Sequence, residues 1–329
     1  MAQTTIRIGT RESQLAVWQA TLVQNLLKEN YISSELVYIK SEGDIDTVTP
    51  LYELGVQGIF TKTLDAALLN NRIDIAVHSM KDVPTQLAGG VQQAAVLKRA
   101  SYKDILVYKG EWSIVNSELG YVSGKSLPTN AESLFTIHHS PFTIATSSIR
   151  RIAQWLNRYP HHQIETLRGN VNTRLSKLKE SNWNGAIFAA AGLERIDLRP
   201  ENSIDLDWML PAPSQGAIMI VCRESDTRSF EACQPFNDAS TASCTKIEKD
   251  FLRVLMGGCS TPISALAEIK DDTILFRGNI CSVNGKQKIE VEKKISVADS
   301  EMLGTIAAKE LLTDIEAQQI LANIRNAKN

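Results

Sequence analysis

Short apolar runs alternate with helical patterns over the first hundred residues of the chain. The runs at 5–9, 34–41 and 73–79 have the length and apolar character of buried strands. Between them, apolar residues recur at helical spacing over 15–26 and 60–68. Because strands and helices alternate, this pattern predicts a mostly parallel sheet with crossover helices.

The same alternation recurs between about residues 100 and 210. Strands are expected at 143–146, at 163–168 and within 184–196, with a helix after each of the first two. The segment 211–223 is punctuated by Pro and Gly and ends in an apolar strand. This segment is either a linker or a return to the first sheet.

The pattern changes from about residue 239 onward. A helix is expected at 243–255, followed by alternating runs that predict an antiparallel sheet and by a closing helix after Ser300. The predicted fold class is therefore α/β, with two α/β domains and a small C-terminal α+β domain. Residues 110–142 are rich in Ser, Asn and Gly, and we interpret them as an insertion that forms a surface excursion or a small hairpin.

Composition narrows the class of protein. The 329 residues include 35 Lys and Arg against 37 Asp and Glu, a formal net charge of −2, which argues against bulk binding to nucleic acid or anionic membranes. No apolar run reaches the roughly 20 residues that span a bilayer, and the start lacks an apolar signal core. The five cysteines are odd in number and lack CxxC spacing, so we expect free thiols, no metal site and a cytoplasmic enzyme.

Basic residues gather at the strand-to-helix turns of the second α/β unit. Between residues 143 and 179, seven basic residues stand against one acidic residue, a local formal charge of +6. Arg150 and Arg151 fall in a first helical turn, where the helix dipole disfavours cations, and Arg11 directly precedes another helix. Such turns meet at the carboxyl ends of parallel strands and form anion sites. A solvated face with local ion pairs is the alternative, but it does not explain the clustering.

The expected anion is a carboxylate rather than a phosphate. The sequence contains no GxGxxG, and the P-loop-like segment 120–126 is one residue short and follows no strong strand. Arginine side chains without a glycine-rich loop are better suited to carboxylates.

Two further segments carry candidate chemistry. Lys81 and Asp82 follow a buried strand, where Asp82 either caps a turn or serves as acid, base or counter-ion to a cationic intermediate. His78, within that strand, is interpreted as a hydrogen-bonded core residue. Cys259 follows two glycines and precedes a proline, so it is either a partly buried loop thiol or an exposed attachment point or nucleophile.

Seven strings of the sequence together carry a resemblance to a known family. In chain order they are IGTRESQLA, HSMKDVP, ATSSIRR, LRGNVNTRL, AAAGLERI, PAPSQGA and GGCSTP. In this order they resemble the porphobilinogen deaminase, or hydroxymethylbilane synthase, family over essentially the whole chain. The resemblance implies two domains of the periplasmic-binding-protein type with a cleft between them, and a third, smaller domain. The implied boundaries are 1–98 with 216–235, then 99–215, then 239–329.

The resemblance also implies a reaction and a cofactor. Four porphobilinogen molecules are joined head to tail with loss of ammonia, and hydroxymethylbilane is released by hydrolysis, in tetrapyrrole (heme) biosynthesis. A dipyrromethane cofactor is attached to Cys259 through a thioether, and Asp82 is the catalytic carboxylate. The implied partner is the small-molecule substrate alone, and we expect a monomer. The residues that match the family's cofactor contacts are Lys81, Asp82, Thr146, Ser148, Arg150 and Arg151. Those that match its substrate contacts are Arg11, Ser13, Gln19, Ser79, Arg168, Arg174 and Arg195.

The sequence departs from the family pattern in two places. Many members carry basic residues in the loop around 55–58, where this chain has Glu53 and Gln57, and the segment 110–142 is longer than the family leads one to expect. Two other function classes are weighed against the synthase. A two-lobed carboxylate-binding receptor would use the same arginines without catalysis but gives Cys259 no role, and a nucleotide-using transferase lacks a phosphate motif.

Overall fold

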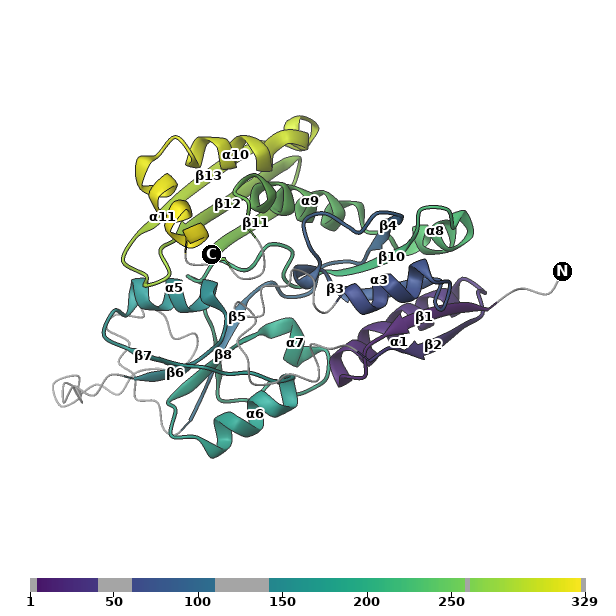
Figure 1. The fold of residues 1–329 in the computed structure, drawn as a ribbon, viewed down its shortest axis with the longest axis horizontal. Helices are drawn as coiled ribbons and strands as arrows, with labels where there is room; N and C mark the ends of the chain where they lie inside the picture. The colour runs from purple at the N-terminus through teal and green to yellow at the C-terminus, as the bar shows by residue number, and fades with distance from the viewer. Residues whose placement is uncertain (1–4, 41–60, 110–141, 258–260, 327–329) are drawn as a thin grey trace.

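The computed structural model consists of three lobes, each built around one sheet (Figure 1). In Figure 1 the purple and blue lobe holds most of the first sheet, the teal lobe holds the second, and the lobe that runs from green to yellow holds the third. The described residues are 5–40, 61–109, 142–257 and 261–326.

The first sheet is mostly parallel, with the strand order β2-β1-β3-β10-β4. β1 is parallel to β2 and β3, whereas β10 is antiparallel to β3 and β4. Helices α1 and α8 pack on one face and α3 packs on the other, which explains the continuously apolar strands. The elements of this lobe are β1 (Ile6–Thr10), α1 (Gln14–Glu29), β2 (Ser34–Tyr38), α3 (Lys62–Leu69), β3 (Ile75–Ser79), the 3₁₀ turn η1 (Met80–Asp82), β4 (Val91–Val96), β10 (Ile218–Arg223), α8 (Thr227–Cys233) and η3 (Gln234–Phe236).

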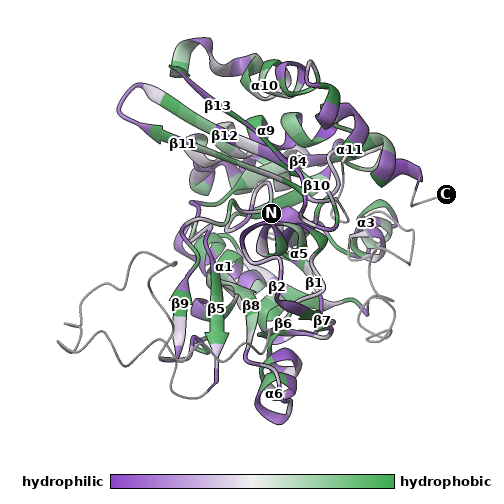
Figure 2. Cartoon of the chain, turned by 90° about the vertical axis from the view of Figure 1, so that its left-hand side faces the viewer, coloured by the Kyte–Doolittle hydropathy of each residue, from purple (hydrophilic) through white to green (hydrophobic). Residues whose placement is uncertain are grey.

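The second sheet repeats this arrangement, with the strand order β7-β6-β8-β5-β9. β6 is parallel to β7 and β8, whereas β5 is antiparallel to β8 and β9. Helices α6 and α7 pack on one face and α5 on the other, and strand β5 is strongly apolar (Figure 2). The elements are β5 (Asp104–Tyr108), β6 (Thr143–Ala145), α5 (Ile149–Arg158), β7 (Gln163–Glu165), α6 (Val171–Glu180), β8 (Gly185–Ala189), α7 (Ala190–Glu194) and β9 (Ser203–Asp205).

The chain crosses between these two lobes twice, through segments 97–103 and 206–217. The first crossing leads from β4 into β5, and the second leads from β9 back into β10. The first crossing is hydrogen-bonded to the second, from Ala100 N to Gly216 O at 3.1 Å, and to the start of β10, from Leu97 N to Ile218 O at 3.0 Å. The segment 211–223 is therefore a return to the first sheet and not a linker.

The third lobe is the expected small α+β unit. Its antiparallel sheet has the order β11-β12-β13, and all three helices pack on one face around Phe251 and Phe276, whose rings lie 5.2 Å apart. Gly304 lets α10 approach α9, because a Cβ at this position would lie 2.0 Å from the Ile247 carbonyl oxygen. Two helices, and not the single one predicted, follow Ser300. The elements are α9 (Ala239–Val254), β11 (Ile263–Lys270), β12 (Thr273–Cys281), β13 (Lys288–Ser296), η4 (Val297–Met302), α10 (Leu303–Leu311) and α11 (Ile315–Asn326).

Candidate active site

The carboxyl ends of β1 and β3 open onto a small polar cavity of about 90 Å³. Ser13 caps α1 by accepting a hydrogen bond from Ala16 N at 3.4 Å, and Gln19 on the same helix donates to Ser79 Oγ at 2.9 Å. The first lobe therefore brings its predicted polar residues together where parallel strands end, which is the usual ligand position in such sheets. The predicted residues that line the cavity are Arg11, Ser13, Gln19, Ser79 and Asp82.

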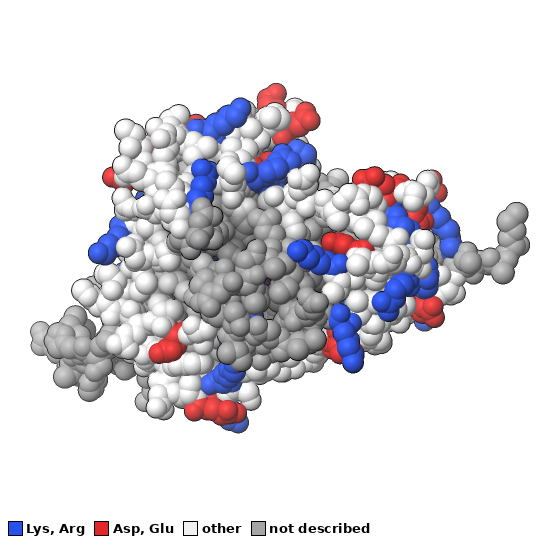
Figure 3. Space-filling view, viewed as in Figure 1, with Lys and Arg blue, Asp and Glu red and all other residues white. Residues whose placement is uncertain are grey.

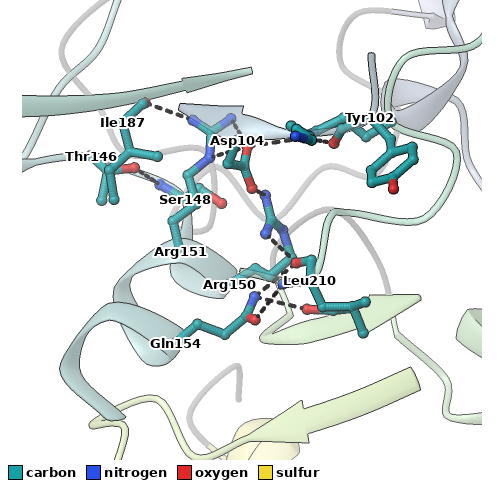
Figure 4. Close-up of polar contacts among 12 residues, drawn as sticks. Tyr102, Asp104, Thr146, Ser148, Arg150, Arg151, Gln154, Ile187 and Leu210 are labelled. Atoms are coloured by element: carbon teal, nitrogen blue, oxygen red, sulfur yellow. Dashed lines mark hydrogen bonds and ion pairs between the residues drawn. The ribbon is translucent and has the colours of Figure 1, made fainter. Parts of the chain in front are cut away.

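Arg150 and Arg151 lie at the start of α5 and share one buried carboxylate, that of Asp104 (Figure 4). Arg150 Nη2 lies 2.6 Å from Asp104 Oδ2, and Arg151 Nη2 lies 2.8 Å from Asp104 Oδ1. Each guanidinium also donates to a backbone carbonyl, that of Leu210 for Arg150 and that of Ile187 for Arg151. These two predicted anion-binding side chains thus already hold one carboxylate of the protein itself.

Burial and charge act in opposite directions on Asp104. Burial alone would raise the pKa of this fully buried carboxyl, but Arg150, Arg151 and Lys81 outweigh burial and lower the pKa to about 2. The same burial lowers the pKa of Arg150. Arg150 Nε is buried without a hydrogen-bond partner among the described residues, so Asp104 does not satisfy this guanidinium completely.

Gln215 connects this carboxylate to the first lobe. Its Nε2 donates to Asp104 Oδ1 at 2.9 Å and to Tyr102 O at 2.7 Å, while its Oε1 accepts from Lys81 Nζ at 3.2 Å. Burial and the nearby Arg151 lower the pKa of Lys81 to about 8, against the opposing effect of Asp82 and Asp104. The Lys81–Asp82 turn of the first lobe and the arginines of the second therefore belong to one electrostatic group.

Thr146 and Ser148 lie between β6 and α5. Thr146 is buried, and its Oγ1 accepts from Ser148 N at 3.3 Å. Ser148 is the N-cap residue of α5, but its side chain makes no capping hydrogen bond. Both residues therefore directly precede the helical turn that carries Arg150 and Arg151.

The remaining predicted arginines lie in the second lobe. Arg168 is buried just before α6. Arg174 donates from Nε to Gly169 O at 2.8 Å, and burial with the nearby Arg151 and Arg168 lowers its pKa to about 10. Arg195 donates to Gly216 O at 2.6 Å, lies over the Trp18 ring, and has a pKa lowered by burial to about 10.

Several predictions fall outside the described residues. These are the roles of Cys259, Glu53 and Gln57 and nearly all of the insertion at 110–142. The four described cysteines are free and buried, and burial raises the pKa of each thiol to about 11 or 12. None of these four thiols is therefore a reactive nucleophile near neutral pH.

The third lobe holds both crossing segments through one buried carboxylate. Glu248 on α9 accepts two hydrogen bonds from Arg99 in the first crossing, at 2.6 and 3.1 Å. It also accepts from Ser214 N in the second crossing, at 2.6 Å, and from Ala267 N of β11, at 2.8 Å. Through Glu248, the third lobe is thus hydrogen-bonded to both segments that join the first two lobes.

Comparisons with known proteins match this architecture along the whole chain. Residues 6–231 match the family model described as "Porphobilinogen deaminase, dipyromethane cofactor binding domain", and residues 242–313 match its C-terminal domain. The chain belongs to the porphobilinogen deaminase family. Curated porphobilinogen deaminases include that of Acidithiobacillus ferrooxidans, 37% identical over 98% of this chain and 99% of its own. That of Syntrophotalea carbinolica is 38% identical over 98% and 96%.

Solved structures that align with this chain include periplasmic binding proteins. A methionine-binding protein, MetQ, is 12% identical and aligns over 72% of this chain and 92% of its own, with a TM-score of 0.42. A sulfonate-binding protein of Methylobacillus flagellatus is 11% identical over 75% and 68%, with a TM-score of 0.39.

Within the described residues, no group of three or more His, Cys, Asp or Glu side chains could hold a metal ion, and no helix is long and apolar enough to cross a membrane. On the face shown in Figure 3, Lys and Arg side chains are scattered and mixed with Asp and Glu. The cations around the buried Asp104 differ from these scattered surface charges, since Arg150, Arg151 and Lys81 act on one carboxylate.

Sequence reasoning missed three residues of this deaminase-family site. Asp104 begins an apolar strand, and Gln215 and Glu248 carry no chemical signature by themselves. Gln215 lies within one of the seven strings that carry the family resemblance, which was the available signal. Asp104 could have been found only from the need of two buried arginines for a counter-ion.

Proposed function

We propose that this chain is the transferase that joins four porphobilinogen molecules head to tail, releases ammonia at each step and frees hydroxymethylbilane by hydrolysis. The observation that carries the proposal is the charge around Asp104. Among the described residues, five interacting cations stand against two carboxylates, Asp82 and Asp104. An excess of positive charge in a desolvated site favours a polyanion, and each porphobilinogen bears an acetate and a propionate. The five cations are Lys81, Arg150, Arg151, Arg168 and Arg174.

The residues present fit a dipyrromethane cofactor. Arg150 Nε lacks a partner among the described residues, and the surrounding cations exceed the protein's own carboxylates, so donors remain for the acidic side chains of two pyrrole rings. When bound, the group supplies the pyrrole carbon to which the first substrate is joined. We propose that Cys259 anchors it through a thioether. The residues that would hold its side chains are Lys81, Asp82, Thr146, Ser148, Arg150 and Arg151.

We propose that Asp82 stabilises the cationic intermediate of the reaction and takes part in proton transfer. Loss of ammonia from porphobilinogen leaves a cationic azafulvene, and the condensed ring must then lose a proton. A fixed carboxylate at the cavity wall stabilises that cation and accepts or relays the proton.

The substrate arm of the proposal rests on residues from both lobes. Their cationic, hydroxyl and amide groups bind the acetate and propionate of porphobilinogen. This binding orients the reacting ring, and such positioning lowers the barrier of the joining step. The proposed substrate-binding residues are Arg11, Ser13, Gln19, Ser79, Arg168, Arg174 and Arg195.

Intact mass of the purified full-length protein tests the proposal together with a turnover assay. We expect a covalent adduct of two pyrrole units on wild type, its absence in Cys259→Ser, and its retention in Cys244→Ser, a matched change at a buried thiol. Wild type should consume porphobilinogen and release ammonia. An unmodified, inactive wild-type chain from cells that make porphobilinogen would favour the carboxylate-binding receptor. We further propose a monomer in the cytoplasm, which light scattering and cell fractionation check.

A further inference from the structure

His78 differs from the other residues that line the first-lobe cavity because part of its side chain is unsatisfied. It lies on β3 opposite Met219 of β10 and is 6% exposed. Its Nε2 is buried and has no hydrogen-bond partner among the described residues. The hydrogen-bonded core histidine that the sequence suggests is therefore buried as expected, but this nitrogen is not bonded.

A buried polar atom without a partner destabilises a fold, so its presence at a ligand cavity calls for an explanation. His78 lines the same cavity as Arg11 and Asp82. The cavity volume of about 90 Å³ has room for a carboxylate arm beside His78.

The electrostatic surroundings of His78 indicate which ligand group belongs there. Burial, with Arg11 and with Lys249 of α9, lowers the pKa of His78 to about 4, so the ring is neutral near pH 7. Lys249 is held in place by hydrogen bonds to the carbonyls of Val83 and Pro84, at 2.9 and 3.1 Å. Burial alone would disfavour any charge here, but the positive charges of Arg11 and Lys249 disfavour the ammonium of the substrate and favour its carboxylates.

We propose that His78 is a substrate-binding residue whose Nε2–H donates a hydrogen bond to one carboxylate arm of porphobilinogen, beside Arg11. The inference rests on the proposed function and adds a specificity group to it. A neutral donor adds directional recognition where Arg11 already provides charge. A substrate analogue without that carboxylate would leave His78 unsatisfied and would bind more weakly.

Two variants of the full-length holoenzyme separate this role from a structural one. His78→Leu removes the donor with little change of volume, and His78→Gln places an amide donor near the position of Nε2. For His78→Leu we expect KM for porphobilinogen to rise about tenfold or more, kcat to stay within about threefold, and the melting temperature to be unchanged or higher. For His78→Gln we expect KM within about threefold of wild type. An unchanged KM in His78→Leu, or a lowered melting temperature with no rescue by glutamine, would overturn the proposal.

Nuclear magnetic resonance tests the site without turnover. The chain has five histidines, and comparison with His78→Gln assigns the imidazole signals of His78. We expect these signals to shift saturably as propionate is added to the wild-type holoenzyme, up to about 100 mM, because millimolar affinity is usual for so small a ligand. Absence of a shift would contradict the inference even where turnover is normal. If wild type does not turn over porphobilinogen, the proposed function fails, while the propionate titration still decides whether His78 meets a carboxylate.

Discussion

The strands of the first two lobes are arranged alike in space, yet the same topological positions carry different chemistry. After β1, helix α1 begins with Gln14, Leu15 and Ala16, whereas after β6 helix α5 begins with Ile149, followed by the paired arginines. After β3 the chain continues with Met80, Lys81 and Asp82, but after β8 it continues with three small residues, 190–192. Both lobes thus provide equivalent positions for a ligand, and the side chains at these positions differ in charge. In the proposed function, the first lobe supplies the catalytic carboxylate, Asp82, and the second lobe supplies most of the cations.

The two reversed strands differ in the same way. β5 begins with the buried carboxylate of Asp104, whereas β10 begins with the apolar Ile218. The polar group associated with β10 is Gln215, three residues upstream, and its amide bonds to Asp104. One charge at the start of one crossing strand therefore organises the arginines of the second lobe and the lysine of the first.

The largest expected effect comes from removing the carboxylate of Asp82, because the equivalent position after β8 in the second lobe carries no carboxylate. Asp82→Asn should lower turnover of porphobilinogen by about 10²- to 10⁴-fold, because the amide neither stabilises the cation nor accepts the proton. Steady-state kinetics and the melting temperature measure this, and the melting temperature should hardly change. Asp65→Asn makes the same chemical change on α3 of the same lobe and should keep wild-type turnover. Comparable activity in the two variants would remove Asp82 from the mechanism.

The second largest effect is expected from removing the charge of Asp104, the counter-ion of the paired arginines in the second lobe. Asp104→Asn should destabilise the fold by about 3 kcal/mol or more, because two buried guanidinium groups lose their shared charge partner. Urea unfolding at pH 7 measures the loss. A change below about 1 kcal/mol would mean that solvent or other groups compensate the arginines.

Lowering the pH should reduce the difference in free energy of unfolding between wild type and Asp104→Asn. The folded-state pKa of Asp104, about 2, lies below its ordinary value of 3.8, so its stabilising effect is complete above about pH 4 and is lost as pH falls towards 2. We expect the difference in free energy of unfolding to shrink by about 2 kcal/mol over that interval, since one pKa unit corresponds to about 1.4 kcal/mol. A difference that is constant between pH 5 and pH 2.5 would contradict the ionised state of Asp104.

The sequence is sufficient to predict much of the fold, because periodicity alone distinguishes the buried strands from the helices. The strands near Ile6 and Ile75 and the helix capped by Ser13 lie where the pattern predicts them. The return of the chain to the first sheet and the reversed direction of β10 depend on long-range strand pairing, which the periodicity of the sequence does not predict. The strand predicted at 163–168 ends at Glu165, since residues 166–170 belong to the turn before α6.

The site was less predictable than the fold. Clustering of Arg150 and Arg151 predicted a site for a ligand anion, and the anion that the structure shows there is the carboxylate of Asp104, on a strand that begins 46 residues before Arg150. Such a partner is invisible to local patterns, because Asp104 precedes an apolar run like any strand-initiating polar residue. Likewise, His78 looked like an ordinary core histidine, and only three-dimensional packing shows that its Nε2 lacks a partner among the described residues.

The smallest effect comes from the equivalent helices α3 and α6, which lead into β3 and β8. Four residues after the N-cap, α3 carries Asp65 and α6 carries Arg174. Burial raises the pKa of Asp65 to about 6, despite its hydrogen bond with Thr61, so the folded protein favours the protonated acid. Because the folded-state pKa is the higher one, stability falls as pH rises from about 4 to about 6 and then stays level.

Asp65→Asn should therefore stabilise the fold near pH 7 by about 1 kcal/mol, since asparagine is always neutral and the partial exposure of Asp65 limits the gain. At pH 4 the variant and wild type should unfold at nearly the same urea concentration, and a gap should open between pH 4 and pH 6. Arg174→Met, the matched change on α6, should instead raise KM for porphobilinogen, because the cation on that helix is proposed to bind substrate. If Asp65→Asn also impaired substrate binding, the two helices would share a role in recognition, and the division of chemistry between the lobes would not extend to them.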